Sequence, residues 1–158
     1  MNEMTATDIV TALIALYGAG LSTLIALREW KARRPDIKVE ISEGAVGLPD
    51  GGWSGHMIFC NALNRGHKAI TLQLVGFQQP NGEQYVIPYP SPYVRFPYDL
   101  LPEKSCKVFT PASDLAAYLK SRGYLQKVSL IGFYNDDVGR RYRSKPAIFD
   151  TNTAKLAK

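Results

Sequence analysis

Apolar residues follow two different patterns along this chain. The first is one unbroken stretch, Ile9–Leu27 (IVTALIALYGAGLSTLIAL), with about 19 residues and neither a charge nor a proline. As a helix it is about 28 Å long, close to the roughly 30 Å hydrocarbon core of a bilayer. The second pattern begins near residue 35, where apolar and polar residues alternate in short segments, as is typical of β-strands.

Three interpretations of the apolar stretch are open, and its flanks favour a membrane span. A signal peptide begins with basic residues and ends at a small-residue cleavage site. Here the start carries Glu3 and Asp8, and Arg28-Glu29-Trp30-Lys31 follows the stretch directly. A buried helix of a soluble domain normally carries a polar stripe, whereas this stretch contains only four weakly polar residues. They are Thr11, Tyr17, Ser22 and Thr23.

The charges on either side of the stretch predict its orientation. Four basic residues follow it, and no Lys or Arg precedes it; the four are Arg28, Lys31, Arg33 and Arg34. Because basic residues stay on the cytoplasmic side, we expect a single-pass protein of the inner (cytoplasmic) membrane with its N-terminus outside and its C-terminal domain in the cytoplasm. Trp30 suits the headgroup region, where an aromatic ring has both apolar and wet surroundings. Residues 1–34 form this anchoring segment.

Small residues recur at helical spacing inside the stretch. They form rows that let two helix backbones approach closely, and the residues concerned are Ala15, Gly18, Ala19 and Ser22. This pattern indicates a face for self-association in the membrane. Small residues are also common in any membrane helix, so both interpretations stay open.

Residues 35–150 have the pattern of a mainly β domain. Its alternating segments are separated by Gly/Pro-rich turns, of which Pro80-Asn81-Gly82 is a strong hairpin signal. One short helix is expected after Thr110, with Thr110 as its cap, Pro111 at its first position and Gly123 at its end. We predict an antiparallel immunoglobulin-like β-sandwich of seven or eight strands, followed by a flexible tail over 151–158.

Several motifs resemble those of a broad group of uncharacterised small bacterial or phage-borne single-pass membrane proteins with a C-terminal immunoglobulin-like β-sandwich. Asn64-Arg65-Gly66 before an apolar strand resembles a strand–turn–strand of bacterial immunoglobulin-like domains. The clusters Arg28-Glu29-Trp30, Phe96-Pro97 and Gly139–Pro146 fit the same plan, as does the segment Leu101-Pro102 to Ser105. The resemblance implies the fold, and its motifs carry no catalytic residues.

Charge and cysteine content say only a little about the protein's partners and its redox environment. The net charge of +5 divides into −2 for residues 1–27, +3 for residues 28–34 and +4 for the remainder. A mildly basic domain is weakly attracted to an anionic membrane surface. Cys60 and Cys106 permit one disulfide, but in a cytoplasmic domain we expect two buried thiols.

Residue spacing does not favour a metal site or a catalytic site. His56 and Cys60 are about 13 Å apart on a strand, too far to share a zinc ion. Asp136-Asp137 fits a hairpin turn better than a calcium loop. No nucleophile elbow or phosphate-binding glycine loop occurs. We therefore expect a protein that is not an enzyme and has no cofactor or metal.

Two segments are candidate contact surfaces. The first is rich in Tyr and Pro, and stiff backbone with large rings makes a pre-ordered surface for a protein partner; its aromatic residues are Tyr89, Tyr93, Phe96 and Tyr98. These rings can alternatively pack on the domain. The second is a basic strand in which Arg141, Arg143 and Lys145 point one way, and it suits an anionic lipid or phosphate or protects a sheet edge.

Together these features predict a membrane-anchored, non-catalytic protein-interaction domain. It would be an accessory or scaffold subunit of a membrane complex, or a phage-borne modulator of the envelope. The alternative is a peripheral binding module for anionic lipid or nucleic acid through the basic strand, with nucleic acid the less favoured ligand. Partners are the membrane, through Ile9–Leu27, and an unknown protein, including a second copy bound through the span.

Overall fold

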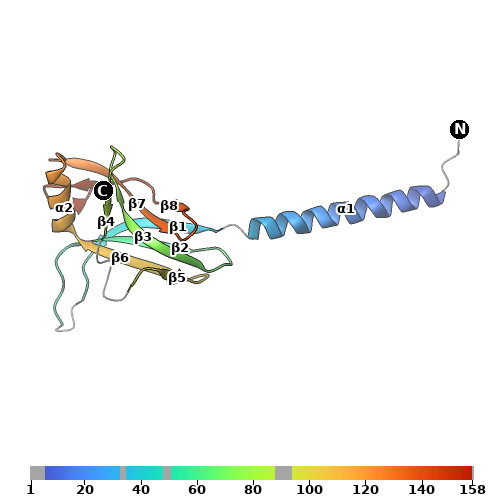
Figure 1. Cartoon of the computed structure of the whole chain (residues 1–158), viewed down its shortest axis with the longest axis horizontal. Coiled ribbons are helices and arrows are strands. Elements are labelled where there is room, and N and C mark those ends of the chain that lie inside the picture. The colour runs from blue at the N-terminus through green and yellow to red at the C-terminus, as the bar shows by residue number, and fades with distance from the viewer. Residues whose placement is uncertain (1–5, 33–34, 48–50, 88–93, 158) are drawn as a thin grey trace. The chain divides into compact units, whose positions relative to one another are not determined.

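The computed structural model describes residues 6–32, 35–47, 51–87 and 94–157 (Figure 1). Contacts between Cα atoms divide the chain into two units, Met1–Arg34 and Pro35–Lys158. The described residues form two helices and ten strands, which is mainly β structure with two antiparallel sheets and an N-terminal apolar helix.

The first unit is helix α1 (Ala6–Ala32). Its segment Val10–Glu29 has a mean hydropathy of 2.0, and within the described residues it is the one helix long and apolar enough to cross a membrane. The hydroxyls of Thr11 and Thr23 donate to the carbonyls of Thr7 and Ala19, each at 2.8 Å. These hydroxyls therefore need no water, which is what an apolar environment demands.

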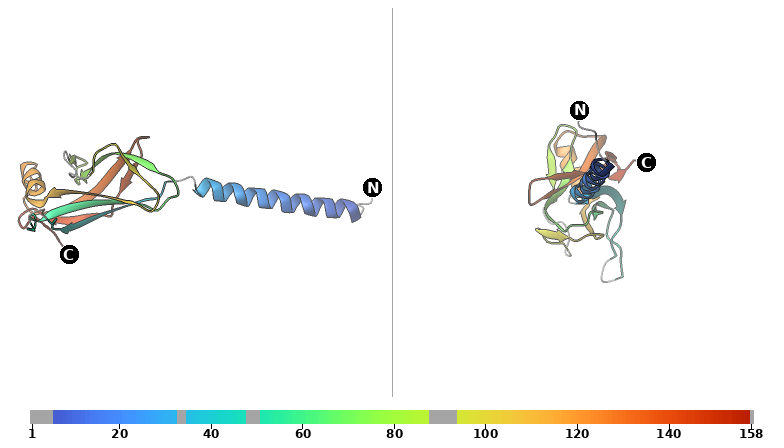
Figure 2. Two further views of the ribbon diagram at one scale, coloured as in Figure 1. Left: turned by 90° about the horizontal axis from the view of Figure 1, so that it is seen from below. Right: turned by 90° about the vertical axis from the view of Figure 1, so that its right-hand side faces the viewer.

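The second unit contains both sheets. The three-stranded sheet has the order β1 (Ile37–Gly44), β2 (Met57–Asn64), β6 (Ser105–Pro111). The larger sheet has the order β10-β9-β7-β3-β4; in addition, β5 pairs with β3 and β8 pairs with β7. Its strands are β3 (Ile70–Gln78), β4 (Gln84–Val86), β5 (Tyr98–Leu100), β7 (Lys127–Asp136), β8 (Arg141–Arg143), β9 (Ala147–Asp150) and β10 (Lys155–Leu156). Figure 2 shows these strands from two further directions.

One apolar core joins the two sheets. Alternation along β2 buries Ile58, Cys60 and Ala62, and the same pattern buries every second residue of β6. These side chains share one cluster with residues of β3, β7 and β9. Cys60 and Cys106 are buried and free, as expected, and burial raises the pKa of the Cys106 thiol to about 11.

A buried hydroxyl connects the sheets through polar contacts. Tyr134 on β7 donates to the carbonyl of Cys60 on β2 at 2.7 Å, and the carbonyl of Cys106 on β6 lies 3.3 Å from the same oxygen. Tyr134 is completely buried, and its burial raises the pKa of the phenol. The hydroxyl therefore keeps its proton and remains a donor to the opposite sheet.

Helix α2 (Ala112–Ser121) begins later than the sequence suggested. Thr110 belongs to β6, where its hydroxyl contacts Tyr85 Oη at 3.2 Å, and the cap position is held by Pro111, which has no side-chain donor or acceptor. The cap prediction for Thr110 and the placing of Pro111 inside the helix were therefore wrong, because strand pairing continues as far as Pro111. Gly123, at φ +89°, follows the helix end.

Two further predictions, a hairpin and a tail, can be compared with the structure. The hairpin at Pro80-Asn81-Gly82 joins β3 to β4, with Gly82 at φ +88° and Asn81 Oδ1 accepting from the Glu83 N–H. The tail from residue 151 to 157 is ordered, in contrast to the predicted flexibility. Thr151 is buried, and its hydroxyl donates a hydrogen bond to the Gln126 carbonyl. Strand β10 pairs with β9.

Replacing Tyr134 by Phe removes the polar contact between the sheets and keeps the ring. Because the substitution removes the hydroxyl's hydrogen bond across the sheets, while both carbonyls keep their partners in the β2–β6 ladder, we expect a loss of about 1 kcal/mol in the free energy of unfolding. The measurement is thermal unfolding of the full-length protein in zwitterionic detergent, followed by circular dichroism at a β-sheet wavelength. Tyr124→Phe is the matched control, since the described structure gives its hydroxyl no hydrogen bond. Equal stability of Y134F and Y124F would contradict the role assigned to Tyr134.

Candidate functional site

The structure uses part of the Tyr/Pro stretch for packing. Tyr89 and Tyr93 lie outside the described residues. Phe96 and Tyr98 are half-buried and pack against the core, and the Phe96 ring centroid is 6.4 Å from that of Tyr134. These two rings therefore contribute to the interior of the domain rather than to an exposed aromatic surface.

The three predicted basic residues have different surroundings. The guanidinium of Arg141 lies over the Phe133 ring at 4.5 Å and donates to Asn135 Oδ1 at 2.9 Å and Gln84 Oε1 at 3.3 Å. Arg141 thus packs on the outer face of its own sheet. Arg143 and Lys145 are exposed and line a groove instead.

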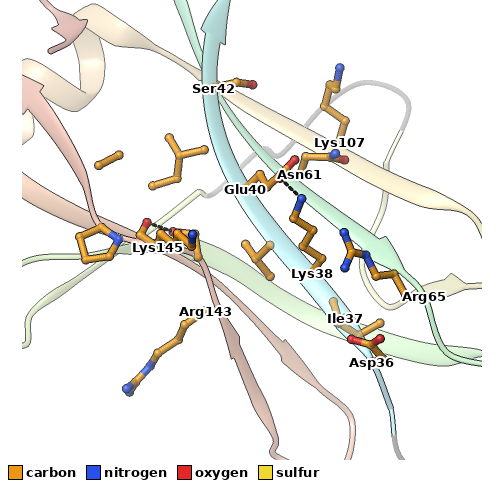
Figure 3. Close-up of a pocket in the computed structure, with 15 residues that line it drawn as sticks. Asp36, Ile37, Lys38, Glu40, Ser42, Asn61, Arg65, Lys107, Arg143 and Lys145 are labelled. Carbon is orange, nitrogen blue, oxygen red and sulfur yellow. Dashed lines mark hydrogen bonds and ion pairs between the residues drawn. The ribbon is translucent and has the colours of Figure 1, made fainter. Parts of the chain in front are cut away.

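The groove has a volume of about 650 Å³ and lies along β1. One side is the outer face of the three-stranded sheet, and the other is the segment 143–147, which runs from the last residue of β8 to the first residue of β9. In Figure 3, Asn61, Arg65 and Lys107 lie on one side of β1, while Arg143 and Lys145 lie on the other. Segments that are about 100 residues apart in the sequence thus form one surface.

Strand register explains how the sheet presents its polar groups. Glu40 on β1 pairs with Asn61 on β2, which pairs with Lys107 on β6, so the three form a row across the sheet. Because side chains alternate along a strand, Lys38 and Ser42 share this outer face with Glu40. The same alternation directs Val39 into the core.

The described lining of the groove is basic. Its two carboxylates are Asp36 and Glu40, against five bases: Lys38, Arg65, Lys107, Arg143 and Lys145. Lys38 forms an ion pair with Glu40 and, through its hydrogen bond first and its charge second, lowers the pKa of that carboxyl. Glu40 therefore remains ionised, and it partly neutralises Lys38. Among the described residues the other four bases form no ion pair, and they provide the positive charge of the groove.

Sequence reasoning missed most of the lining, including Lys38, Arg65 and Lys107, and among the missed residues Asn61 stands out. Its side-chain oxygen is buried and has no hydrogen-bond partner within the described structure. Alternation along β2 places Asn61 on the outer face, but only the pairing of β2 with β1 and β6 places it between Glu40 and Lys107. A buried acceptor without a donor is costly, so this position favours a ligand that brings a donor.

The remaining candidate groups are occupied within the domain. His56 Nε2 lies 3.2 Å from Glu43 Oε2, and Cys60 and Cys106 are in the core. Asp136 Oδ1 accepts from the N–H groups of Val138 and Arg140, and its Oδ2 accepts from the Tyr142 hydroxyl at 2.8 Å. Burial and the Asp136 contact raise the pKa of Tyr142 to about 12. Across the described residues, no three His, Cys, Asp or Glu side chains are grouped to hold a metal ion.

Comparisons with known proteins give only distant matches. No protein-family model matches the chain, and no curated protein matches it. An X-ray structure of a Northeast Structural Genomics Consortium target is similar with a TM-score of 0.35 and 11% identity, over 73% of this chain and 84% of that one. A crystal structure named for an ApaA protein from Bordetella pertussis is similar with a TM-score of 0.34 and 10% identity, over 73% and 91%. At these TM-scores the likeness carries no assignment of fold family or function.

Proposed function

We propose that this protein is a membrane-anchored, non-catalytic protein-interaction module, and that its basic groove is the contact surface. It would serve as an accessory or scaffold subunit of a membrane complex, or as a phage-borne modulator of the envelope. The observation that carries the proposal is the convergence of β1, Lys107 and the segment 143–147 on one groove with five bases and two carboxylates. Its volume lies in the range of roughly 300–1,000 Å³ typical of ligand sites.

The proposed fold is an immunoglobulin-like sandwich. In that fold, one sheet has strands A, B and E adjacent, and the other has G, F and C, with C′ added in variable domains. The order β1-β2-β6 corresponds to A-B-E, and β9-β7-β3-β4 corresponds to G-F-C-C′. Helix α2 is then inserted between E and F.

A close approach between β2 and β7 supports this correspondence. A Cβ atom built at Gly132 on β7 would lie 2.9 Å from the sulfur of Cys60 on β2. In a disulfide, a Cβ and the partner's sulfur are also about 3 Å apart, as the 2.05 Å sulfur–sulfur bond requires. Strands B and F are the ones that carry the inter-sheet disulfide of antibody domains.

Gly132→Cys is therefore expected to form a disulfide with Cys60 on mild oxidation. The bond closes a loop of roughly 70 residues and is expected to add up to about 4 kcal/mol to the free energy of unfolding. Mass spectrometry of cross-linked peptides and the number of titratable thiols measure it. Gly132→Ser, which adds a Cβ but no thiol, is the control for crowding against Ile41. If G132C keeps three titratable thiols after oxidation, the correspondence of β2 and β7 with B and F loses this support.

The proposed location is the inner membrane, with the second unit in the cytoplasm. Support comes from the length and hydropathy of α1 and from the basic residues at its C-terminal end, Arg28, Lys31, Arg33 and Arg34. Arg28 is exposed, and Arg33 and Arg34 lie outside the described residues, as do the side chains of Trp30 and Lys31. Ala15, Gly18, Ala19 and Ser22 are exposed along α1, as the proposed self-association requires.

Membrane fractionation tests this location. The full-length protein should stay in the pellet after an alkaline carbonate wash, because an apolar span of this length leaves the bilayer only at high cost. Protease added outside should leave the second unit intact, and protease added to inverted vesicles should degrade it. Release by carbonate would exclude a span, while digestion from outside would reverse the orientation.

Site-specific photo-cross-linking in cells tests the interaction function. A photoreactive residue replacing Ser42, in the groove, should give one adduct of discrete mass, whereas the same residue at Lys120 on α2 should not. The pair Lys107→Glu and Arg143→Glu should abolish the adduct, because it reverses two groove charges. The pair Lys120→Glu and Lys127→Glu makes the same change in net charge elsewhere and should keep it. An adduct that survives the groove pair would contradict the proposal.

The alternative function is binding of anionic lipid or nucleic acid, and the clustering of Arg143 and Lys145 with Lys38, Arg65 and Lys107 favours it. Binding of this kind weakens steeply as salt rises. Sedimentation with anionic vesicles that the groove pair abolishes, together with an absence of protein adducts, would support this alternative in place of the interaction function.

A further inference from the structure

Strand β1 has one paired edge and one free edge. Its paired edge contacts β2, and Asp36 O accepts from Arg65 N at 2.7 Å, which identifies residues 36 and 65 as a hydrogen-bonded pair. Hydrogen-bonded pairs recur at every second residue of an antiparallel ladder. The N–H and C=O groups of Ile37, Val39 and Ile41 therefore point to the opposite edge, where no backbone group of the described residues pairs with them.

The groove lies along this free edge. All residues from Asp36 to Ser42 line it, and the facing segment is the connection between β8 and β9. That connection contains Pro146, which has no N–H to donate, and its Ser144 N–H donates to Gly132 O instead of to β1. The backbone groups on the free edge thus border the groove, and within the described residues neither β8 nor the connection that follows it pairs with them.

We propose that an extended acidic segment of the partner protein occupies the groove and adds a strand to the free edge of β1. This inference rests on the proposed interaction function and specifies its mode. Main-chain hydrogen bonds to Ile37, Val39 and Ile41 supply affinity, as in other cases of strand addition, and the bases supply selectivity for carboxylates. A second copy of this chain does not fit, because it would bring the same bases against one another.

The two faces of β1 specify the sequence pattern of the added strand. Side chains on one face of that strand would continue the outer face of Lys38, Glu40 and Ser42, close to the bases. Those on the other face would lie beside Ile37 and Ile41, which pack against the core. The segment is therefore expected to alternate acidic and apolar residues with a period of two.

Peptide binding tests the proposal. The protein is full-length in phosphatidylcholine nanodiscs, and the probe is the acetylated, amidated octapeptide (Glu-Val)4. Two isomers carry the same charge, one N-methylated at every Glu and the other at every Val. Because alternate residues of a strand donate to opposite edges, one isomer should bind at least tenfold more weakly than the parent and the other should bind like it. The parent should also slow amide exchange over residues 37–41, and the groove pair of charge reversals should remove both effects.

The outcomes separate this inference from the function on which it rests. If both isomers bind as the parent does, and binding falls with salt, the groove recognises charge alone; strand addition is then overturned while the interaction function stands. If no peptide binds but anionic vesicles do, both are overturned in favour of lipid binding. If neither the peptides nor the vesicles bind, strand addition and the interaction function are both overturned. The bases and Pro146 then serve only to keep the free edge from pairing with other chains.

Discussion

The domain depends on one buried hydroxyl that connects its two sheets. Tyr134 donates from β7 to the carbonyl of Cys60 and lies close to that of Cys106, which are on neighbouring strands of the opposite sheet. Apolar packing holds the sheets together, and a directed bond in a low dielectric adds a specific alignment to that packing. Gly132 is two residues from Tyr134 on β7, and its close approach to Cys60 on β2 follows from the same alignment.

The sequence was informative where structure is local. The apolar stretch, the alternation in β1, β2 and β3, and the turn at Asn81-Gly82 each depend on neighbouring residues, and the structure has them close to their predicted positions. Thr110 is the instructive exception. Its side chain fits a helix cap, but pairing of β6 with β2 continues beyond it and extends the strand. Tertiary pairing thus overrode a local preference of about 1 kcal/mol.

The groove could not be predicted from the sequence, because its residues are brought together only by the pairing and register of the strands. Lys38, Lys107 and Arg143 belong to three strands, and nothing in their spacing along the chain indicates that they share a surface. The sequence did identify Arg143 and Lys145, but it grouped them with Arg141, whose guanidinium is held by Phe133 and Asn135. Two-residue periodicity gives the face of a strand, and only the pairing of strands gives the neighbours on that face.

The last strand, β10, contacts β1 near the C-terminal end of β1, whereas the chain enters β1 from α1 at its N-terminal end. The Leu156 N–H donates to Glu43 Oε2 at 2.8 Å, and Glu43 is six residues along β1 from Ile37, about 20 Å in an extended strand. Tension applied between the two ends of this domain is therefore directed along β1. The hydrogen bonds between β1 and β2 then carry the load in shear, all together, rather than opening one after another as they would if the strand were peeled away. The domain is thereby arranged to resist a pull between its two ends.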